Sequence, residues 1–302
     1  MQEIKDFLIS EKNAMQRLDH FLVCQTTWNK SQSQKLILSQ KVLVNHKPAK
    51  KRYLLKIKDL VTITATVFKT PLNIQKPYNL NLDVIYEDPY LAVINKPSNL
   101  IVHPSLSFSG ITLINGLIYQ FKSLSNLDTL RPGIVHRLDK NTTGLILIAK
   151  NDNVSQKLQT AFNTRTIKKV YWAFIEGFLE DKGTINLPIA RNTHDRLKMA
   201  VLLNGKQSIT HFKTLKRFKN FSLMEFILET GRTHQIRTHL SYLKHPIVGD
   251  KLYGSKHYNT DLGQFLHAKE LIFTHPITSQ KMKLKAPLPL NFTQLIQTLT
   301  NI

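Results

Sequence analysis

The segment from Gly133 to Lys150 carries the side chains best placed to do chemistry, because a polar loop runs directly into an apolar strand. Asp139 lies in that loop, so we expect its carboxylate at the edge of the core, partly withdrawn from water. The neighbouring cations Arg137 and Lys140 would oppose the effect of desolvation and keep the acid ionised. An ionised, oriented carboxylate can act as a nucleophile or a base. The alternative is a turn or helix-cap aspartate paired with Arg137, and the local pattern alone favours that interpretation.

Other chemistries have no matching pattern in the sequence. Gly205-Lys206 lacks the upstream glycine and the following hydroxyl of a phosphate-binding loop, and no dinucleotide fingerprint occurs. His234 and His239 are five residues apart with no glutamate between them, so they do not form a zinc-binding helix face. We therefore expect no nucleotide or nicotinamide cofactor and no metal ion.

The chain of 302 residues is strongly basic, with 42 Lys and Arg against 20 Asp and Glu and a formal charge of +22. Hydrophobic residues still make up 42% of it, which is typical of an ordered protein and not of a disordered tail. Cations that neutralise phosphates release counterions, so nucleic acid is the first expected partner and an acidic membrane surface the second.

The location of the protein is predicted from its cysteine and its apolar runs. Cys24 is the single cysteine, which excludes an intrachain disulfide and indicates a reducing cytoplasm; we expect it to be buried in an N-terminal helix. The first ten residues lack the long apolar stretch of a secretory signal. The uncharged run 142–149 is far shorter than the roughly 20 residues of a transmembrane helix. We expect a cytoplasmic monomer without a membrane partner.

Residues 17–64 form a small basic module. Apolar spacing predicts two short helices, and strand patterns at 42–45 and 61–64 flank a turn. No acidic residue occurs from His20 to Lys58. A solvated face is the simpler explanation, but one-signed charge on a folded unit usually has a partner, and RNA fits best. The candidate RNA contacts are Lys35, Lys47, Lys50, Lys51 and Arg52.

We predict a small α/β RNA-binding domain over residues 1–69, a linker at 70–80 and a larger domain over 81–302. The proline-containing stretch 68–81 has the composition of a linker. Beyond it, apolar runs at 91–94, 144–149, 170–175 and 223–228 predict strands, and a capped helix is predicted over 152–163. The runs do not alternate regularly with helices, so the expected class is α+β with a mixed, largely antiparallel sheet.

The motif His136-Arg137-Leu138-Asp139, followed by Thr143-Gly144-Leu145 and an apolar strand, resembles the signature of the RluA-type pseudouridine synthases. Further similar segments follow in order along nearly the whole chain: Glu87-Asp88, 93–97, Val102-His103-Pro104, Lys169-Val170-Tyr171, 230–239, 245–250, Leu266-His267-Ala268 and 273–276. The basic module resembles the small RNA-binding domain first named from a small-subunit ribosomal protein. Within the family the arrangement is most similar to the RluD branch, which acts on large-subunit ribosomal RNA.

This resemblance implies isomerisation of uridine to pseudouridine in structured RNA, above all large-subunit (23S) ribosomal RNA or its precursor particles, without a cofactor. The target base must leave the helical stack. The family's catalytic aspartate maps onto Asp139. By the same resemblance, Tyr171 would stack on the flipped base and help to remove its ring proton. Arg237 would pair with Asp139, and Arg137 would fill the space that the base vacates.

The resemblance implies roles for two further residues, and the sequence departs from the family pattern at two places. Arg232 is expected to contact phosphate, although its role and that of Arg237 could be exchanged, and His136 is expected to be a structural donor or an RNA contact. Asn141 stands where an aspartate is common. Ser31-Gln32-Ser33-Gln34 replaces the serine-arginine pattern of the RNA-binding domain, which leaves that helix short of phosphate contacts.

Two rival functions stay open at this point. A catalytically silent RNA-binding or ribosome-assembly factor would use the basic surface alone, with Asp139 only a turn residue. A nuclease or base-excising hydrolase would need a metal cluster or an activated water. Product analysis separates the three, because the enzyme leaves isomerised uridine, the silent factor unchanged RNA, and the hydrolase cleaved or abasic RNA.

Overall fold

The computed structural model describes residues 5–26, 28, 30–64, 76–104, 108, 110–128, 131–255 and 263–300. The chain divides into two compact units, residues 1–72 and 73–302. Each unit has hydrophobic clusters of its own. The predicted linker at 70–80 falls partly outside the described residues, which resume at Lys76.

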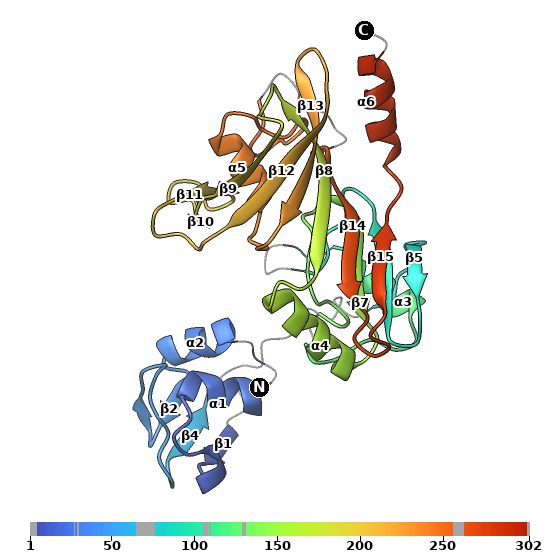
Figure 1. The fold of residues 1–302 in the computed structure, drawn as a ribbon. Helices are drawn as coiled ribbons and strands as arrows, with labels where there is room; N and C mark the ends of the chain where they lie inside the picture. The colour runs from blue at the N-terminus through green and yellow to red at the C-terminus, as the bar shows by residue number, and fades with distance from the viewer. Residues whose placement is uncertain are drawn as a thin grey trace. The chain divides into compact units, whose positions relative to one another are not determined.

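The N-terminal unit combines two short helices with a four-stranded antiparallel sheet (Figure 1). Its elements are β1 (Lys5–Leu8), a 3-10 turn (Glu11–Asn13), α1 (Leu18–Gln25), α2 (Lys30–Leu38), β2 (Val42–Val44), β3 (Lys47–Pro48) and β4 (Leu60–Ile63), with strand order β1-β4-β2-β3. The two predicted helices and the strands around a turn are confirmed. Strand β1 was not predicted, because four residues of mixed polarity give little periodic signal.

The core of this unit explains one wrong expectation. Helix α1 buries Leu18, Phe21 and Leu22 against the sheet residues Val42 and Val61. Cys24 lies on α1, but it is exposed and not buried as expected. Its position two residues after Leu22 turns the thiol away from the buried face of the helix.

A nine-stranded sheet forms the centre of the second unit (Figure 1). Its strands are β5 (Asp83–Glu87), β6 (Leu91–Lys96), β7 (Thr143–Ala149), β8 (Lys168–Glu176), β9 (Lys182–Asn186), β12 (Ile209–Arg217), β13 (Phe221–Leu228), β14 (Leu266–Thr274) and β15 (Lys281–Lys285). The order is β5-β6-β7-β14-β8-β13-β12-β9, with β15 paired to β14. Among the strand pairs described, only β7 and β14 run parallel, so the predicted α+β class with a largely antiparallel sheet is confirmed.

Side chains alternate between the two faces of this sheet along each strand. The clusters in which they pack show which helices cover each face. On β7, Ile146 and Ile148 pack in one cluster with residues of α3 (Leu113–Gln120) and α5 (Gln235–Tyr242). Leu145 and Leu147 pack in the opposite cluster with α4 (Asp152–Asn163). The predicted helix at 152–163 is confirmed, and the Asn151 side chain caps it. Helix α6 (Leu290–Thr300) adds Phe292 to a third cluster with Phe174 of β8.

Strands β7 and β14 lie very close together where β7 begins, just after the loop that carries Asp139. Gly144 has a positive φ of 101°, and a Cβ atom there would lie 2.3 Å from the Ala268 carbonyl oxygen. No other residue fits this position without moving a strand. A small two-stranded sheet, β10 (Ile189–Arg191) and β11 (Met199–Val201), lies beside α5 (Figure 1). No helix in the described part of the chain is both long and apolar enough to cross a membrane.

Candidate active site

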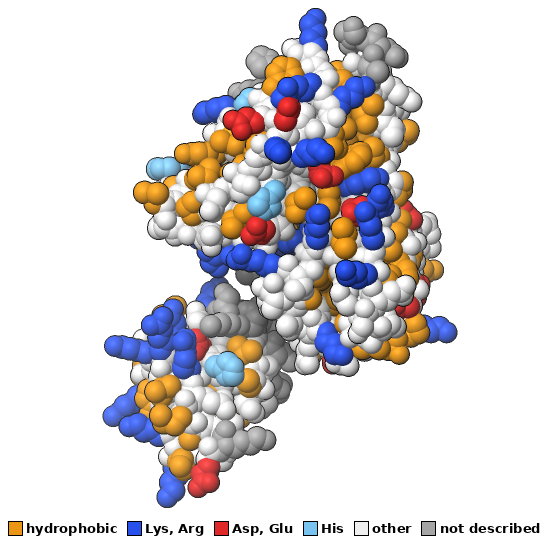
Figure 2. Space-filling model, viewed as in Figure 1, with side chains coloured by type: hydrophobic (Ala, Val, Ile, Leu, Met, Phe, Trp, Pro, Cys, Tyr) orange, Lys and Arg blue, Asp and Glu red, His pale blue; other side chains and the backbone are white. Residues whose placement is uncertain are grey.

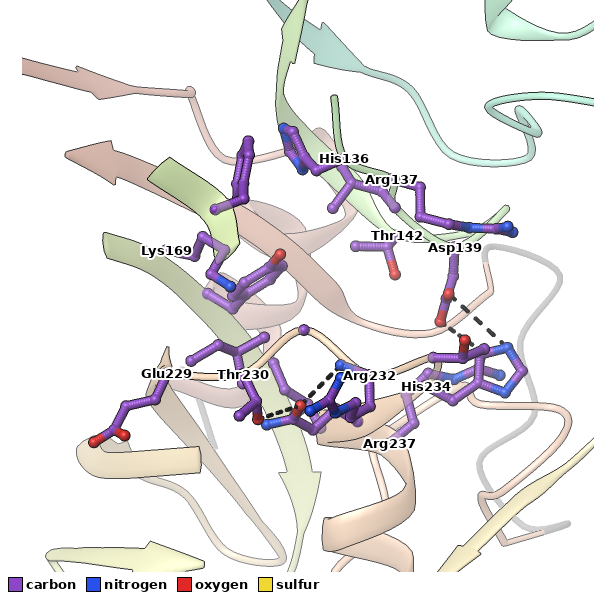
Figure 3. A pocket seen from close by; sticks show the side chains of 18 of the residues that line it. His136, Arg137, Asp139, Thr142, Lys169, Glu229, Thr230, Arg232, His234 and Arg237 are labelled. Atoms are coloured by element: carbon purple, nitrogen blue, oxygen red, sulfur yellow. Dashed lines mark hydrogen bonds and ion pairs between the residues drawn. The ribbon is translucent and has the colours of Figure 1, made fainter. Parts of the chain in front are cut away.

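A cleft of about 530 Å³ in the second unit gathers all six site residues that the sequence predicts for this domain. They are Asp139, Tyr171, Arg237, Arg137, His136 and Arg232, and they come from the loop before β7, from β8, and from the loop and helix after β13. Figure 3 shows Asp139, His234 and Arg237 together at one side of the cleft and Lys169 and Glu229 at the other. Residues far apart in sequence thus meet in one place.

Asp139 is half-buried, and its carboxylate is held by α5. The side chain is 20% exposed, and its Oδ2 accepts a hydrogen bond of 2.8 Å from Arg237 Nη1. The structure therefore pairs Asp139 with Arg237, whereas Arg137 Nη1 lies 3.1 Å from His103 Nε2. The geometry favours an oriented carboxylate over the alternative of a turn aspartate paired with Arg137. Enough of Asp139 stays open for a ligand to reach it.

Arg237 is itself fixed by a second carboxylate. Its Nε and Nη2 donate to the two oxygens of Asp250 at 2.7 and 2.9 Å, and its guanidinium carbon lies 5.0 Å from the centre of the Tyr253 ring. The Asp250 side chain is fully buried. A guanidinium held by two bonds on one edge has a fixed plane, so its remaining nitrogen places Asp139 with little freedom. Sequence reasoning assigned no role to Asp250, because it lies 111 residues from Asp139 and local spacing cannot pair them.

His234 completes the polar surroundings of Asp139. It caps α5 in the left-handed conformation, with φ at 55°, and its Nε2 lies 3.9 Å from Asp139 Oδ1. Its Nδ1 is 2.9 Å from the Tyr253 hydroxyl. Burial lowers the pKa of His234 below the ordinary value, so the ring is uncharged at neutral pH. The loop before it is fixed by Gln235, whose side-chain oxygen accepts from the Thr230 hydroxyl and the Arg232 N–H.

Tyr171 lies on the buried face of β8, with 8% of its surface exposed, and lines the cleft. Burial, and after it the nearby Asp139 carboxylate, raise the pKa of Tyr171 well above its ordinary value. The phenol is therefore protonated at neutral pH. Its ring belongs to the main hydrophobic cluster, which agrees with the core position that apolar periodicity alone predicts. One face of the same ring can serve the core and another the cleft.

His136 and Arg232 also line the cleft, each anchored differently. His136 Nε2 accepts a hydrogen bond of 2.8 Å from the Leu147 N–H, and its ring lies 4.6 Å from that of Phe162. Burial lowers the pKa of His136 to about 3. Arg232 is exposed and donates one bond of 3.3 Å to the Gln207 carbonyl. His136 is thus held in the lining of the cleft by its contacts, while the Arg232 guanidinium is accessible to a ligand.

Lys96 supports the Asp139 loop from below and was not singled out in the sequence. It is fully buried, and its ammonium donates to the carbonyls of Pro97, Leu100 and Lys140. Burial lowers the pKa of Lys96 to about 7, while Asp139 acts in the opposite direction. Because one ammonium binds all three carbonyls, it fixes the backbone of Lys140, the residue after Asp139. Its partners Leu100 and Lys140 lie in separate loops, so local spacing holds no signal for this role.

The basic candidates of the N-terminal unit are mostly accessible. Lys35, Lys47, Lys50 and Arg52 are exposed, and Lys51 is half-buried. Lys47, Lys50 and Arg52 line a second hollow of about 590 Å³. Figure 2 shows Lys and Arg side chains gathered on this unit. Gln34 has another role than phosphate contact: its amide donates 2.7 Å to the buried Asp19, which Arg17 also binds.

Comparison with known proteins decides the family. The profile of the family described as RNA pseudouridylate synthase matches residues 90–242, which include Asp139, Tyr171 and Arg237. The chain belongs to this family. A second profile, the S4 domain, matches residues 16–61 of the N-terminal unit. The predicted family and the predicted RNA-binding module are thereby confirmed.

Several relatives of this RNA pseudouridine synthase are similar over most of their length. The chain is 39% identical over 297 residues to the uncharacterized RNA pseudouridine synthase YlyB of Bacillus subtilis, with 97% of each chain covered. It is 40% identical to ribosomal large subunit pseudouridine synthase D of Haemophilus ducreyi, covering 74% of this chain and 72% of that one. The solved structure of human RNA pseudouridylate synthase domain containing 1 superposes with a TM-score of 0.58 and 25% identity, covering 76% and 98% of the two chains.

Membership of the family gives the class of enzyme, and the cleft contains side chains that can carry out the reaction of that class. The protein is an RNA pseudouridine synthase, an isomerase that acts on RNA. Across the described ranges, no group of three or more His, Cys, Asp or Glu side chains is arranged to hold a metal ion. The chemistry available in the cleft is that of one oriented carboxylate, a buried phenol and several cations.

Proposed function

We propose that this synthase isomerises uridine in large-subunit ribosomal RNA, with Asp139 as the catalytic carboxylate acting on a base flipped into the cleft. The observation that carries the proposal is the 2.8 Å bond that fixes Asp139 Oδ2 to Arg237, beside the ring of Tyr171 in a cleft that a nucleotide can enter. A positioned, partly exposed carboxylate is the group that can attack the nucleoside or assist departure of its base.

The remaining residues of the cleft fit complementary roles. Tyr171 presents a ring on which a flipped uracil can stack, and base–aromatic stacking contributes about 1–3 kcal/mol. Arg137 extends from the same loop as Asp139 and is exposed, so it can occupy the space that the base leaves in the helix. Arg232 can bind a phosphate at the mouth of the cleft. No step in this scheme requires a cofactor.

The substrate class rests on two lines of support. Relatives named ribosomal large subunit pseudouridine synthase D match 73–89% of the chain at 38–40% identity. The S4 domain adds exposed cations, which bind RNA through its phosphates and strengthen binding at low salt. We propose that the N-terminal unit binds the ribosomal RNA or its precursor particle and that the protein acts as a monomer.

The test is product analysis on an in vitro transcript of large-subunit ribosomal RNA, incubated with the wild-type protein and mapped for pseudouridine. The expected result is isomerisation at a small number of uridines. Unchanged RNA would favour a silent RNA-binding factor, and cleaved or abasic RNA would favour a hydrolase. A parallel transfer RNA transcript tests the choice of substrate.

A further inference from the structure

Lys169 is a buried cation in the cleft that the scheme above does not use. It lies on β8 two residues before Tyr171, so both side chains project from the same face of the strand. Only 9% of Lys169 is exposed, and it lines the cleft with Asp139 and Tyr171. Figure 3 shows its side chain at the side of the cleft opposite to Asp139. No hydrogen bond or ion pair reaches its ammonium from the residues that the structure describes.

Among the described residues that line the cleft, Glu229 is the carboxylate on the side of Lys169, and it already has partners. Glu229 lines the cleft, but its Oε1 lies 2.7 Å from His211 Nε2 and its Oε2 lies 3.7 Å from Arg165 Nη1. The Glu229 side chain is 41% exposed, so it also remains in contact with water. Among the described residues, Lys169 therefore lacks a protein counterion. The Lys169 side chain is mostly buried and its ammonium opens only into the cleft, so a ligand bound in the cleft can supply the missing counter-charge.

The other groups facing Lys169 are cationic or neutral. Burial, and after it the charge of Arg165, lower the pKa of Lys169 to about 8, so the ammonium is still mostly protonated at neutral pH. His136 is uncharged, and the charge of Lys169 contributes, after burial, to lowering its pKa. Arg232 is exposed on the loop after β13. This side of the cleft is thus a preformed, electropositive hollow.

We propose that Lys169 is a further catalytic residue, which donates hydrogen bonds to the oxygens of the flipped base and stabilises its negative charge while it is detached from the sugar. This inference rests on the proposed function. When the bond between C1′ and ring nitrogen N1 breaks, its electron pair passes to the base and spreads over the carbonyl oxygens. The bond between C1′ and ring carbon C5 then forms, the proton on C5 passes to water, and N1 takes a proton from water, so no co-reactant other than solvent is needed.

A base oxygen fits this position better than a phosphate. Phosphates of the RNA backbone stay near water, where the exposed guanidiniums of Arg137 and Arg232 can meet them. Lys169 instead lies beside Tyr171 on the buried face of β8. A base stacked on Tyr171 would direct one edge toward Asp139 and the other toward Lys169. Once a bound base excludes water from the cleft, a fixed donor stabilises developing charge far more strongly than a donor in water does.

The test compares Lys169→Met, Lys169→Arg and Lys168→Met in single-turnover assays on the large-subunit ribosomal RNA transcript. Lys168 is the matched control, because it is the adjacent residue on β8 and is exposed on the opposite face. Lys169→Met should lower the rate about 100-fold or more, the size seen when one donor to a developing charge is removed, with RNA affinity changed less than about threefold. Lys169→Arg should restore part of the rate, and Lys168→Met should keep it.

Two further readouts separate chemistry from folding and from phosphate binding. The wild-type rate should fall as pH rises through about 8, where Lys169 loses its proton, and the fall should move to higher pH in Lys169→Arg. Lys169→Met should melt at or above the wild-type temperature, since it removes an unpaired buried charge; a structural role predicts the opposite. If Lys169→Met fails to fold, Lys169→Gln takes its place.

A rate within about threefold of wild type for Lys169→Met would overturn the proposal. So would a decrease confined to affinity, with the log–log salt slope smaller by about 0.7–0.9, which is the behaviour of a phosphate-binding lysine. Failure of the proposed function has a different signature, because then the wild-type protein forms no pseudouridine or Asp139→Asn retains full activity.

Discussion

Arg237 ties Asp139 to the buried carboxylate of Asp250, giving one nitrogen to the first at 2.8 Å and two to the second at 2.7 and 2.9 Å. The two aspartates come from the loop before β7 and the segment after α5, so one guanidinium joins segments that are separate in sequence. Because Asp250 fixes the plane of the guanidinium, the orientation of Asp139 depends on a residue that itself lies too deep to touch RNA.

Replacing this guanidinium should affect chemistry and stability together. In Arg237→Lys the charge remains, but a single ammonium cannot serve both carboxylates with the same geometry. We expect the single-turnover rate to fall at least about tenfold, and the free energy of unfolding to fall by about 2 kcal/mol, the value of a charge-assisted hydrogen bond. Urea unfolding and rate assays measure the two effects. The control is Arg232→Lys, at an exposed arginine that donates to one carbonyl, and equal decreases in both variants would contradict the account.

The ring and the hydroxyl group of Tyr171 should make separate contributions to the reaction rate. Because its pKa is raised, the hydroxyl stays protonated and cannot act as a phenolate base at neutral pH. Tyr171→Phe keeps the stacking surface, so we expect a rate within about tenfold of wild type. Tyr171→Leu removes stacking worth about 1–3 kcal/mol, so we expect the rate to fall about 5- to 150-fold. If the phenylalanine variant is as inactive as the leucine variant, the hydroxyl takes part in the chemistry and the assignment is wrong.

The N-terminal unit should control affinity more than chemistry. Removing residues 1–69 takes away the dense cations of the S4 domain but none of the cleft residues. We expect the remaining unit to fold and to modify RNA with lower affinity and poorer site choice, since linked binding modules act at high effective concentration. The salt dependence of binding should become flatter by about 0.7–0.9 log units for each phosphate that the shortened protein no longer binds.

A substitution series locates those phosphate-binding residues within the intact chain. Changing Lys47, Lys50 and Arg52 together to Gln should reproduce much of the decrease in affinity, because these residues line the hollow of the N-terminal unit. Lys58→Gln is the control, an exposed lysine of the same unit that does not line it. An unchanged salt slope for the triple variant would show that RNA binds elsewhere.

Acid should destabilise the second unit before its carboxylates titrate. Burial lowers the pKa of His136 to about 3 and those of His103 and His267 to about 4, from an ordinary 6.5. The unfolded chain therefore binds more protons than the folded one below pH 6.5, and stability should fall as the pH drops from about 6.5 toward 4. Urea midpoints across this range give the slope. His136→Gln keeps an acceptor for the Leu147 N–H, and it should make the urea midpoint less dependent on pH. The exposed control His194→Gln should leave that dependence unchanged.

Local patterns were sufficient for the elements that are strongly buried. The apolar runs of β6, β7, β8 and β13 and the capped helix α4 were predicted near their observed bounds. Burial on one face leaves a periodic pattern, and burial on both faces leaves a continuous apolar run. The polar loop before β7 marked Asp139 as a candidate, but the local pattern alone favoured a turn aspartate. Only the resemblance of residues 136–145 to the family signature predicted a catalytic role for it.

Long-range partners could not be predicted in that way. The pairing of Arg237 with Asp250 and the buried ammonium of Lys96 beneath the Asp139 loop depend on how strands and loops meet in space. Cys24 shows the limit even within a helix, because α1 is too short for its apolar face to be defined by periodicity alone. Nor did spacing reveal that Gln34 binds the buried Asp19.

The most direct measurement is single-turnover pseudouridine formation by Asp139→Asn on the large-subunit ribosomal RNA transcript, with RNA affinity measured in parallel. The amide keeps the size of the side chain and a hydrogen-bond acceptor for Arg237, but it removes the charge and the nucleophile. We predict no detectable pseudouridine, and affinity within a few-fold of wild type because binding rests on many dispersed cations. Appreciable turnover by this variant, with the substitution verified in the purified protein by mass spectrometry, would contradict the assignment of Asp139 as the catalytic residue.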